Sequence, residues 1–168
     1  QEHEVLEVLV RRAEAMQVPY KIYGRDFQAE NIRYTCSGMQ FDVAIGQTVY
    51  PDLQIPLLGE HQAKNCALAL AVCMDVMAEL CRESEAPDIF SDTMCNQIRR
   101  QLSAIHHPGR MELLRSDPFV LLDACINSAS CENVKEVLRH LGIQNCTVIV
   151  GIPEDKDYAG VVRSMRDM

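Results

Sequence analysis

Residues 61–82 read HQAKNCALALAVCMDVMAELCR, and this stretch decides the fold of the first part of the chain. Apolar side chains occupy nearly every side of the helix that it predicts, and Gly59 and Glu60 open that helix. A helix that is apolar all round is typically buried in a protein core. We therefore expect a long, buried helix over roughly 61–82.

The residues before this helix predict one more helix and a small sheet. Apolar side chains at helical spacing predict a helix over 2–16 that packs by one face. Residues 19–23 predict a short strand. Weak alternation over 31–45, followed by 52–58, predicts two or three antiparallel strands.

The residues after the long helix change character at Pro108. A second helix is predicted from a cap at 91–92 to about Ile105, and the sequence HHPG at 106–109 ends it. The pattern that follows predicts strands over 111–115, 119–123 and 147–151, with helices over 130–141 and from 157. Continuous apolar strands that alternate with helices indicate a parallel sheet covered on both faces. We predict the α/β class, with a domain boundary at Pro108.

Composition excludes several classes of function. The chain has 168 residues, 48% of them hydrophobic, and 16 lysines and arginines against 24 aspartates and glutamates give a net charge of -8. This charge disfavours binding to nucleic acid or to an anionic membrane surface. No apolar run approaches the roughly 20 residues of a membrane-spanning helix, so we expect a soluble, cytoplasmic protein. The eight cysteines form no C-x-x-C pair and predict buried, metal-free thiols.

Three residues are candidates for binding a ligand. Asp123 ends an apolar strand, where a carboxylate can accept hydrogen bonds from ribose hydroxyls, although Asp123 or Ser128 could simply cap the next helix. Arg110 follows the predicted junction, where a guanidinium can bind phosphate oxygens or be an ordinary surface charge. Asn65, near His61 on the long helix, could pair with an adenine edge or be a satisfied core amide. The chain contains no G-x-x-x-x-G-K-[ST] phosphate loop.

Three stretches carry a resemblance to a known family. They are LLGEHQAKNCALAL at 57–70, PGRME at 108–112 and VLLD at 120–123, and they resemble folylpolyglutamate synthase/dihydrofolate synthase of the Mur ligase superfamily. The similarity extends to GRDF at 24–27 and to 150–157, in the order and at the spacing of the family.

The resemblance implies which part of such an enzyme this chain represents. In the family, a central ATPase-type domain with a P-loop precedes a Rossmann-like C-terminal domain. Residues 1–107 would form the end of the central domain, with its small antiparallel β-region, and 108–168 the first half of the parallel-sheet C-terminal domain. Because the chain begins with Gln1 rather than Met and neither part looks complete, we expect a piece of a longer protein. The P-loop and the Mg²⁺ ligands would then lie outside it.

The resemblance also implies an activity and three residue roles. The family uses ATP to phosphorylate a carboxylate of a folate or pteroate, and the amino group of glutamate attacks the acyl phosphate. Asn65 would contact adenine, Arg110 the nucleotide phosphates and Asp123 the ribose. We expect the partners to be these small molecules alone, and the protein to be a monomer.

One departure from the family pattern leaves other readings open. The family usually has Asp-Gly-Ala-His-Asn-Pro where this chain has DACINS at 123–128, so Ile126 takes the position of the His and Ser128 that of the Pro. An alkyl side chain cannot donate, accept or titrate as an imidazole does. The alternatives are a Mur-type peptide ligase with a different acceptor and a non-catalytic homologue used for binding.

Overall fold

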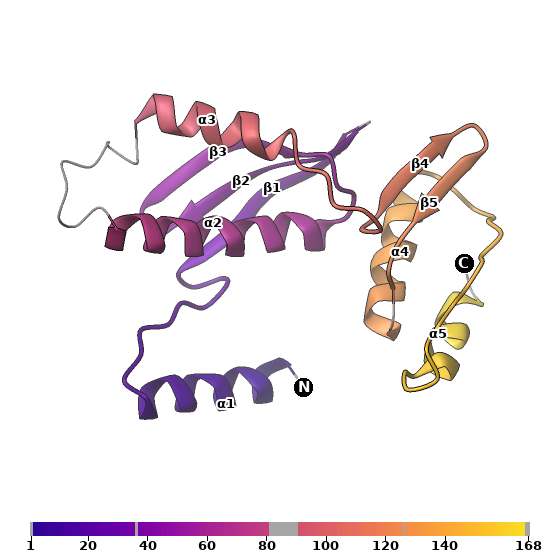
Figure 1. Ribbon diagram of the computed structural model, residues 1–168, viewed down its shortest axis with the longest axis horizontal. Coiled ribbons are helices and arrows are strands. Elements are labelled where there is room, and N and C mark those ends of the chain that lie inside the picture. The colour runs from indigo at the N-terminus through magenta and orange to yellow at the C-terminus, as the bar shows by residue number, and fades with distance from the viewer. Residues whose placement is uncertain (1, 36, 81–90, 126, 167–168) are drawn as a thin grey trace.

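The computed structural model describes residues 2–35, 37–80, 91–125 and 127–166. In the described residues, a three-stranded antiparallel sheet and three helices form the first part of the molecule, and a two-stranded hairpin and two helices form the second (Figure 1). The class is therefore mixed α and β with antiparallel sheets.

Helix α1 (Glu2–Ala15) is the helix expected at the N-terminal end, but its apolar stripe is exposed. Val5, Val8 and Leu9 are 59%, 66% and 62% exposed, so the expectation of a helix packed by one face was wrong. Figure 1 shows α1 set apart from the sheet. Helical periodicity identifies an apolar face, but it does not supply a partner for that face.

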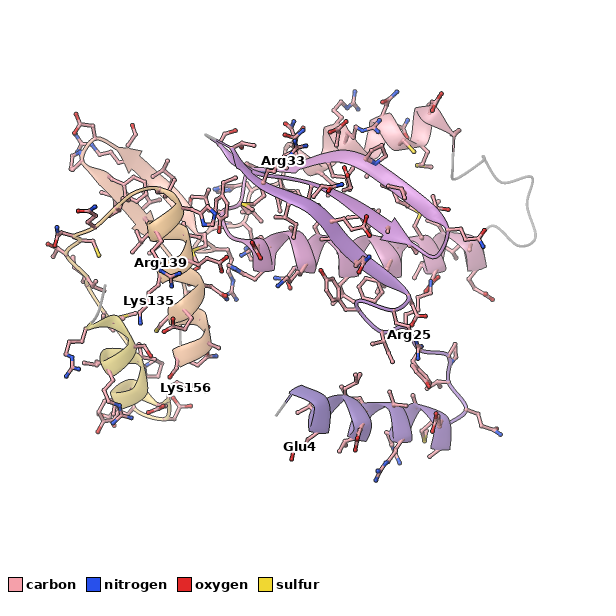
Figure 2. All side chains as sticks on the ribbon, turned by 180° about the vertical axis from the view of Figure 1, so that it is seen from behind. Glu4, Arg25, Arg33, Lys135, Arg139 and Lys156 are labelled. Carbon is pink, nitrogen blue, oxygen red and sulfur yellow. The ribbon has the colours of Figure 1, made fainter. Side chains whose placement is uncertain are left out.

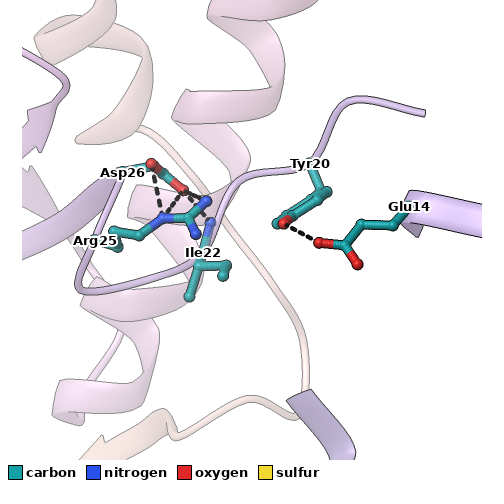
Figure 3. A network of polar contacts seen from close by, with 5 residues as sticks. All are labelled: Glu14, Tyr20, Ile22, Arg25 and Asp26. Atoms are coloured by element: carbon teal, nitrogen blue, oxygen red, sulfur yellow. Dashed lines mark hydrogen bonds and ion pairs between the residues drawn. The ribbon is translucent and has the colours of Figure 1, made fainter. Parts of the chain in front are cut away.

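The segment that follows α1 is held by local polar contacts (Figure 3). Tyr20 Oη donates to Glu14 Oε1 at 3.3 Å, and the backbone N–H of Ile22 donates to Asp26 Oδ2 at 2.7 Å. Arg25 pairs with Asp26 at 2.8 Å. Within residues 19–23 only an isolated bridge from Tyr23 to Phe27 is formed, so the short strand expected there was wrong.

The first sheet contains β1 (Phe27–Thr35), β2 (Gly38–Ile45) and β3 (Thr48–Ile55), in that order and antiparallel. This confirms the expected antiparallel strands, although the last one begins and ends earlier than 52–58. Alternate residues of β2 enter the core, where Met39, Phe41 and Val43 are at most 1% exposed.

Helix α2 (Glu60–Leu80) confirms the long helix, but only one of its faces is buried. Ala63, Ala67 and Ala71 lie in the core shared with the sheet. Leu68 and Val72 are 51% and 54% exposed, so the expectation of burial on all sides was wrong. A single sheet can cover only the face of the helix that contacts it.

Helix α3 (Asp92–Leu102) begins where the sequence predicts and ends before Ile105. The Ser91 hydroxyl oxygen caps it by accepting from the N–H of Met94 at 3.3 Å. Residues 103–111 then connect the helix to the second part of the molecule without regular structure.

Strands β4 (Glu112–Ser116) and β5 (Phe119–Leu122) match the strands expected after Pro108, but they pair antiparallel. A two-residue turn folds β5 back onto β4, whereas a parallel pair needs a long crossover connection. Residues 147–151 form no strand, and Ile149 is 95% exposed. The parallel Rossmann-like sheet expected over 108–168 is therefore absent from the described residues, because the second apolar segment has no hydrogen-bonded strand beside it.

Helices α4 (Ser128–His140) and α5 (Tyr158–Met165) complete the second part. Asn127 caps α4 by accepting from the N–H of Ser130 at 2.8 Å, and Asp157 caps α5. A small core of Leu58, Met111 and Val137 lies where the two parts of the molecule meet.

Charged side chains lie on both parts of the molecule. Figure 2 shows Arg25 and Arg33 on the first part, and Lys135, Arg139 and Lys156 on the second.

None of the helices in the described ranges combines the length and the apolar character that a membrane span requires.

The cysteines differ from the expectation of general burial. Of the six in the described ranges, all free thiols, the buried ones are Cys66 and Cys131, and the exposed ones are Cys73 and Cys146. Cys36 and Cys81 lie outside the described residues.

Candidate functional site

A pocket of about 860 Å³ lies where the two parts of the molecule meet. Asn65 on α2, Arg110 in the connection and Asp123 at the end of β5 all line it, so the fold brings the three predicted residues into one cavity. The remainder of the wall is polar near Asp123 and apolar between α2 and α3. The polar lining includes His61, Gln62, Ser130 and Asn133, and the apolar lining includes Met74, Met77, Met94 and Ile98.

Gly59 sets the direction in which α2 starts. Its φ of +106° is in the region that favours glycine, and a Cβ there would lie 2.6 Å from Cε1 of His61. Its carbonyl accepts from the N–H of Gln62 at 2.9 Å, which forms the first turn. A glycine at this position therefore allows the His61 ring to lie against the backbone at the helix start.

His61 is a half-buried imidazole in the wall of the pocket. Burial lowers its pKa, which the nearby Asp123 partly counteracts, so the ring is neutral near pH 7. The side-chain amide nitrogen of Gln62 lies 3.0 Å from Nε2 of His61, and because an amide nitrogen can only donate, Nε2 accepts. The proton of the neutral ring is then on Nδ1, which is buried without a hydrogen-bond partner. Sequence reasoning had named His61 only as a neighbour of Asn65.

Asp123 holds the connection between the two parts of the molecule. Its Oδ2 accepts from the backbone N–H of Met111 at 2.9 Å, and the N–H of Ala124 donates to the carbonyl of Gly109 at 2.8 Å. The cap of α4 is Asn127, so the alternative of Asp123 or Ser128 as its cap was wrong. A carboxylate accepts on both oxygens, so Oδ1 is available for a ligand hydroxyl.

Glu112 holds the same connection from the other side. Its Oε2 accepts from the N–H of Gly109 at 2.7 Å, and its Oε1 lies 3.1 Å from Nε2 of His106. The Gly109 bond first, and then the bond with His106, holds the pKa of this carboxyl below its usual value. No motif in the sequence pointed to this role, because the contact depends on how the connection turns.

Arg110 is exposed, but its backbone is fixed on both sides. Gly109 is bound by Glu112, and Met111 is buried with its N–H bound to Asp123. The backbone of Arg110 is therefore held in a defined position, and Arg110 lines the same pocket as Asp123. Asn65 is also exposed, one turn along α2 from His61.

This arrangement can bind a ligand that has a hydrogen-bonding base, hydroxyl groups and an anion. An amide, a carboxylate oxygen and a guanidinium are present, and each suits one of those groups. In the part of the chain that the structure describes, no group of three or more His, Cys, Asp or Glu side chains is placed to hold a metal ion.

Comparison with known proteins finds folylpolyglutamate synthases among the relatives of this chain. The folylpolyglutamate synthase of Lacticaseibacillus casei is 30% identical over 139 residues, which are 83% of this chain and 30% of that protein. The dihydrofolate synthase/folylpolyglutamate synthase of Mycobacterium tuberculosis is 30% identical over 118 residues, covering 70% of this chain and 23% of the relative. The chain is a homologue of the folylpolyglutamate synthases and dihydrofolate synthases of the Mur ligase family.

Solved structures of folylpolyglutamate synthases have the same fold over nearly the whole chain. An FPGS complex with AMPPCP and folate has a TM-score of 0.81 and 26% identity, covering 97% of this chain and 38% of that one. A Mycobacterium tuberculosis folylpolyglutamate synthase complexed with ADP and AMPPCP has a TM-score of 0.75 and 27% identity, covering 96% and 34%. The chain thus spans about a third of the length of these relatives. No protein-family model matches it.

Proposed function

We propose that this chain is the nucleotide-facing part of an ATP-dependent carboxylate–amine ligase that adds glutamate to a folate or pteroate. The pocket carries the proposal, because an amide, a guanidinium and a carboxylate from three separate segments line one cavity. The homology to folylpolyglutamate synthases supports the same reaction class.

In this proposal each of the three residues binds one part of ATP. The Asn65 amide pairs with the adenine edge, and the free carboxylate oxygen of Asp123 accepts from the ribose hydroxyls. Arg110 binds the phosphates with its planar guanidinium. The γ-phosphate passes to a carboxylate of the acceptor, and the amino group of glutamate then displaces phosphate to form the amide.

The proposal divides the chain at the connection that Asp123 and Glu112 hold. Residues 1–107 would be the end of the central ATPase-like domain, and 108–168 the start of the C-terminal domain. Mg²⁺ would accompany the phosphates of ATP, with its ligands and the phosphate loop in the parts of the longer protein that this chain does not contain. The enzyme would act as a cytoplasmic monomer.

A Mur-type peptide ligase is the second candidate. The UDP-N-acetylmuramoyl-L-alanyl-D-glutamate--2,6-diaminopimelate ligase of Halalkalibacterium halodurans is 29% identical over 135 residues, which cover 79% of this chain and 24% of that protein. The hypothesis of a non-catalytic homologue depends on Ile126, which lies outside the described residues. All three hypotheses share the scaffold and differ in what the longer protein does with it.

Calorimetry and turnover of the longer protein test the proposal. Asp123→Ala should weaken ATP binding by about 1.5–3 kcal/mol, the value of a hydrogen bond to a charged group. Asp155→Ala is the matched control, because this carboxylate lies in an exposed turn and does not line the pocket. Equal ATP affinity in the wild type and in Asp123→Ala would contradict the ribose assignment.

Acceptor choice separates the candidate functions in the same assay. ADP release that requires both glutamate and a folate or pteroate supports the first candidate, and release that requires a UDP-linked muramoyl peptide supports the second. Binding of ATP without turnover on either acceptor supports the non-catalytic homologue.

Arg110→Ala should reduce kcat more than ATP affinity if its phosphate contact forms mainly in the transition state.

A further inference from the structure

Two cysteine thiols lie against each other beside the pocket wall. Sγ of Cys125, in the loop after β5, is 3.2 Å from Sγ of Cys131, in the first turn of α4. Both are free thiols. A disulfide bond is about 2.05 Å long, so the sulfur atoms need to approach by only about 1 Å.

We propose that Cys125 and Cys131 form a redox modification site, a dithiol that closes into an intramolecular disulfide by exchange with a small disulfide such as oxidised glutathione. The site does not depend on the proposed ligase activity. It rests on the contact between a thiol in the loop after β5 and a thiol in the first turn of α4.

Burial of the two thiols sets the order of the reaction. Cys131 is fully buried, with its Sγ 4.0 Å from the carbonyl oxygen of Val161 on α5, whereas Cys125 is only partly buried. Cys125 is therefore the thiol that oxidised glutathione can reach. Cys131 is placed to attack the mixed disulfide that forms on Cys125.

The thiol–disulfide exchange takes place in two steps. Cys125 loses its proton and attacks one sulfur of oxidised glutathione, whose S–S bond breaks and releases one glutathione thiolate. Cys131 then loses its proton, attacks Sγ of Cys125 and displaces the second glutathione thiolate. The two protein thiols are oxidised, the glutathione disulfide is reduced to two thiols, and the two protons pass to them.

The surroundings of Cys125 make this exchange slow and the product durable. Burial, and then the hydrogen bond with Cys131, raises the pKa of the Cys125 thiol to about 12. Only a small fraction is thiolate near pH 7, so attack is slow and speeds up as pH rises. A thiol of high pKa is also a poor leaving group, so the disulfide is slow to be reduced.

The disulfide would connect two segments that carry pocket residues. Asp123 precedes Cys125 by two residues, and Ser130 immediately precedes Cys131. Both Asp123 and Ser130 line the pocket. Oxidation would therefore tie the loop after β5 to the start of α4 and fix this part of the wall.

Peptide mapping of the native 168-residue chain tests the inference. The chain is incubated with oxidised glutathione, alkylated and digested, and its cysteine peptides are identified by mass spectrometry. We expect the single peptide that contains both Cys125 and Cys131 to be unalkylated and lighter by two hydrogen atoms than its reduced form, while the exposed Cys146 carries glutathione. A lasting mixed disulfide on Cys125 with Cys131 still alkylated, or no reaction of either while Cys146 is modified, would overturn the inference.

Two variants and a denatured control test the order and the need for the fold. In Cys131→Ser, Cys125 should accumulate as a stable mixed disulfide because the second thiol is absent. In Cys125→Ser, Cys131 should stay reduced because it is buried, and equal glutathionylation of Cys131 would contradict the order. Urea should remove the preference for the Cys125–Cys131 pair, and the same preference in unfolded chain would show that the fold does not create the site.

Discussion

The two sheets of this protein differ in how completely their apolar side chains are covered. In β2, Met39, Phe41 and Val43 are at most 1% exposed, whereas Phe119 and Leu122 of β5 are 37% and 46% exposed. The first sheet has three strands and α2 packed on one face. The second is a lone hairpin, a structure that is marginal without further strands or a covering helix. Stability should therefore be concentrated in the first part of the molecule.

Replacing one apolar side chain in each sheet by alanine measures this contrast and should give the largest effect. Phe41→Ala, in the core under α2, should lower the free energy of unfolding by about 3–5 kcal/mol, because it leaves a cavity that cannot collapse. Val120 on β5 is 40% exposed, so Val120→Ala should lower the free energy of unfolding by about 1 kcal/mol or less. Denaturant unfolding of both variants measures the difference. Equal losses would mean that the hairpin is as tightly packed as the first sheet.

Alanine substitutions of two glycines compare the stability of the junction between the two parts with that of the second part. Gly59→Ala places a Cβ against His61 in a backbone with a φ of +106°, and this should cost about 1–3 kcal/mol for the strained backbone alone, with the steric clash in addition. Gly142→Ala, after α4, has a φ of +70° and open space around its Cβ, so only the backbone cost applies. Thermal unfolding should rank Gly59→Ala as the more destabilised. The reverse ranking would show that the ring of His61 moves aside freely.

The helix caps offer a comparison in which the two parts should behave alike. Ser91→Ala removes the cap of α3, and Asn127→Ala removes that of α4. Each should lower stability by about 1 kcal/mol, the usual value of an N-cap. Circular dichroism during thermal unfolding checks both. A much larger loss for Asn127→Ala would mean that the second part depends on the loop before α4 more than the first part depends on the start of α3.

We expect the smallest effect from His61, which should make the free energy of unfolding depend on pH. Burial lowers its pKa in the folded protein, so the unfolded chain binds more protons between that value and about 6.5. Stability is therefore complete above about pH 6.5 and is lost as pH falls through this window. His61→Gln should flatten the profile between pH 7.5 and pH 5.5 in urea unfolding, and the exposed His107→Gln should not. Identical slopes in all three proteins would show that His61 is not the group responsible.

Much of the local structure was predictable because its signals are short-range. The periodicity of 61–82, the cap at Ser91 and the two strands after Pro108 all identified elements that the structure contains. Each signal depends on residues within a few positions of one another. Homology to folylpolyglutamate synthases also followed from three short motifs, and the comparisons confirmed it.

The sequence pointed to three residues that line one pocket, but it did not indicate the hydrogen bonds that hold the pocket wall. Asn65, Arg110 and Asp123 were selected from their positions in the sequence, and they line one pocket. Their roles toward adenine, phosphate and ribose stay predictions. The bond from Met111 N–H to Asp123 and the contact of Glu112 with Gly109 could not be inferred, because they depend on how the connection folds over the end of β5.

Local spacing and chain stiffness made the helices and the paired strands recognisable from the sequence, although the strands expected over 19–23 and 147–151 did not form. What each apolar surface contacts depended on how the whole chain folds. Residues 119–123 and 147–151 have the same apolar character, yet the first pairs with β4 and the second forms no strand. The apolar stripe of α1 and the outer face of α2 are exposed for the same reason. An apolar pattern indicates that a surface favours burial, but burial requires a partner surface. The position of that partner depends on residues far away along the chain.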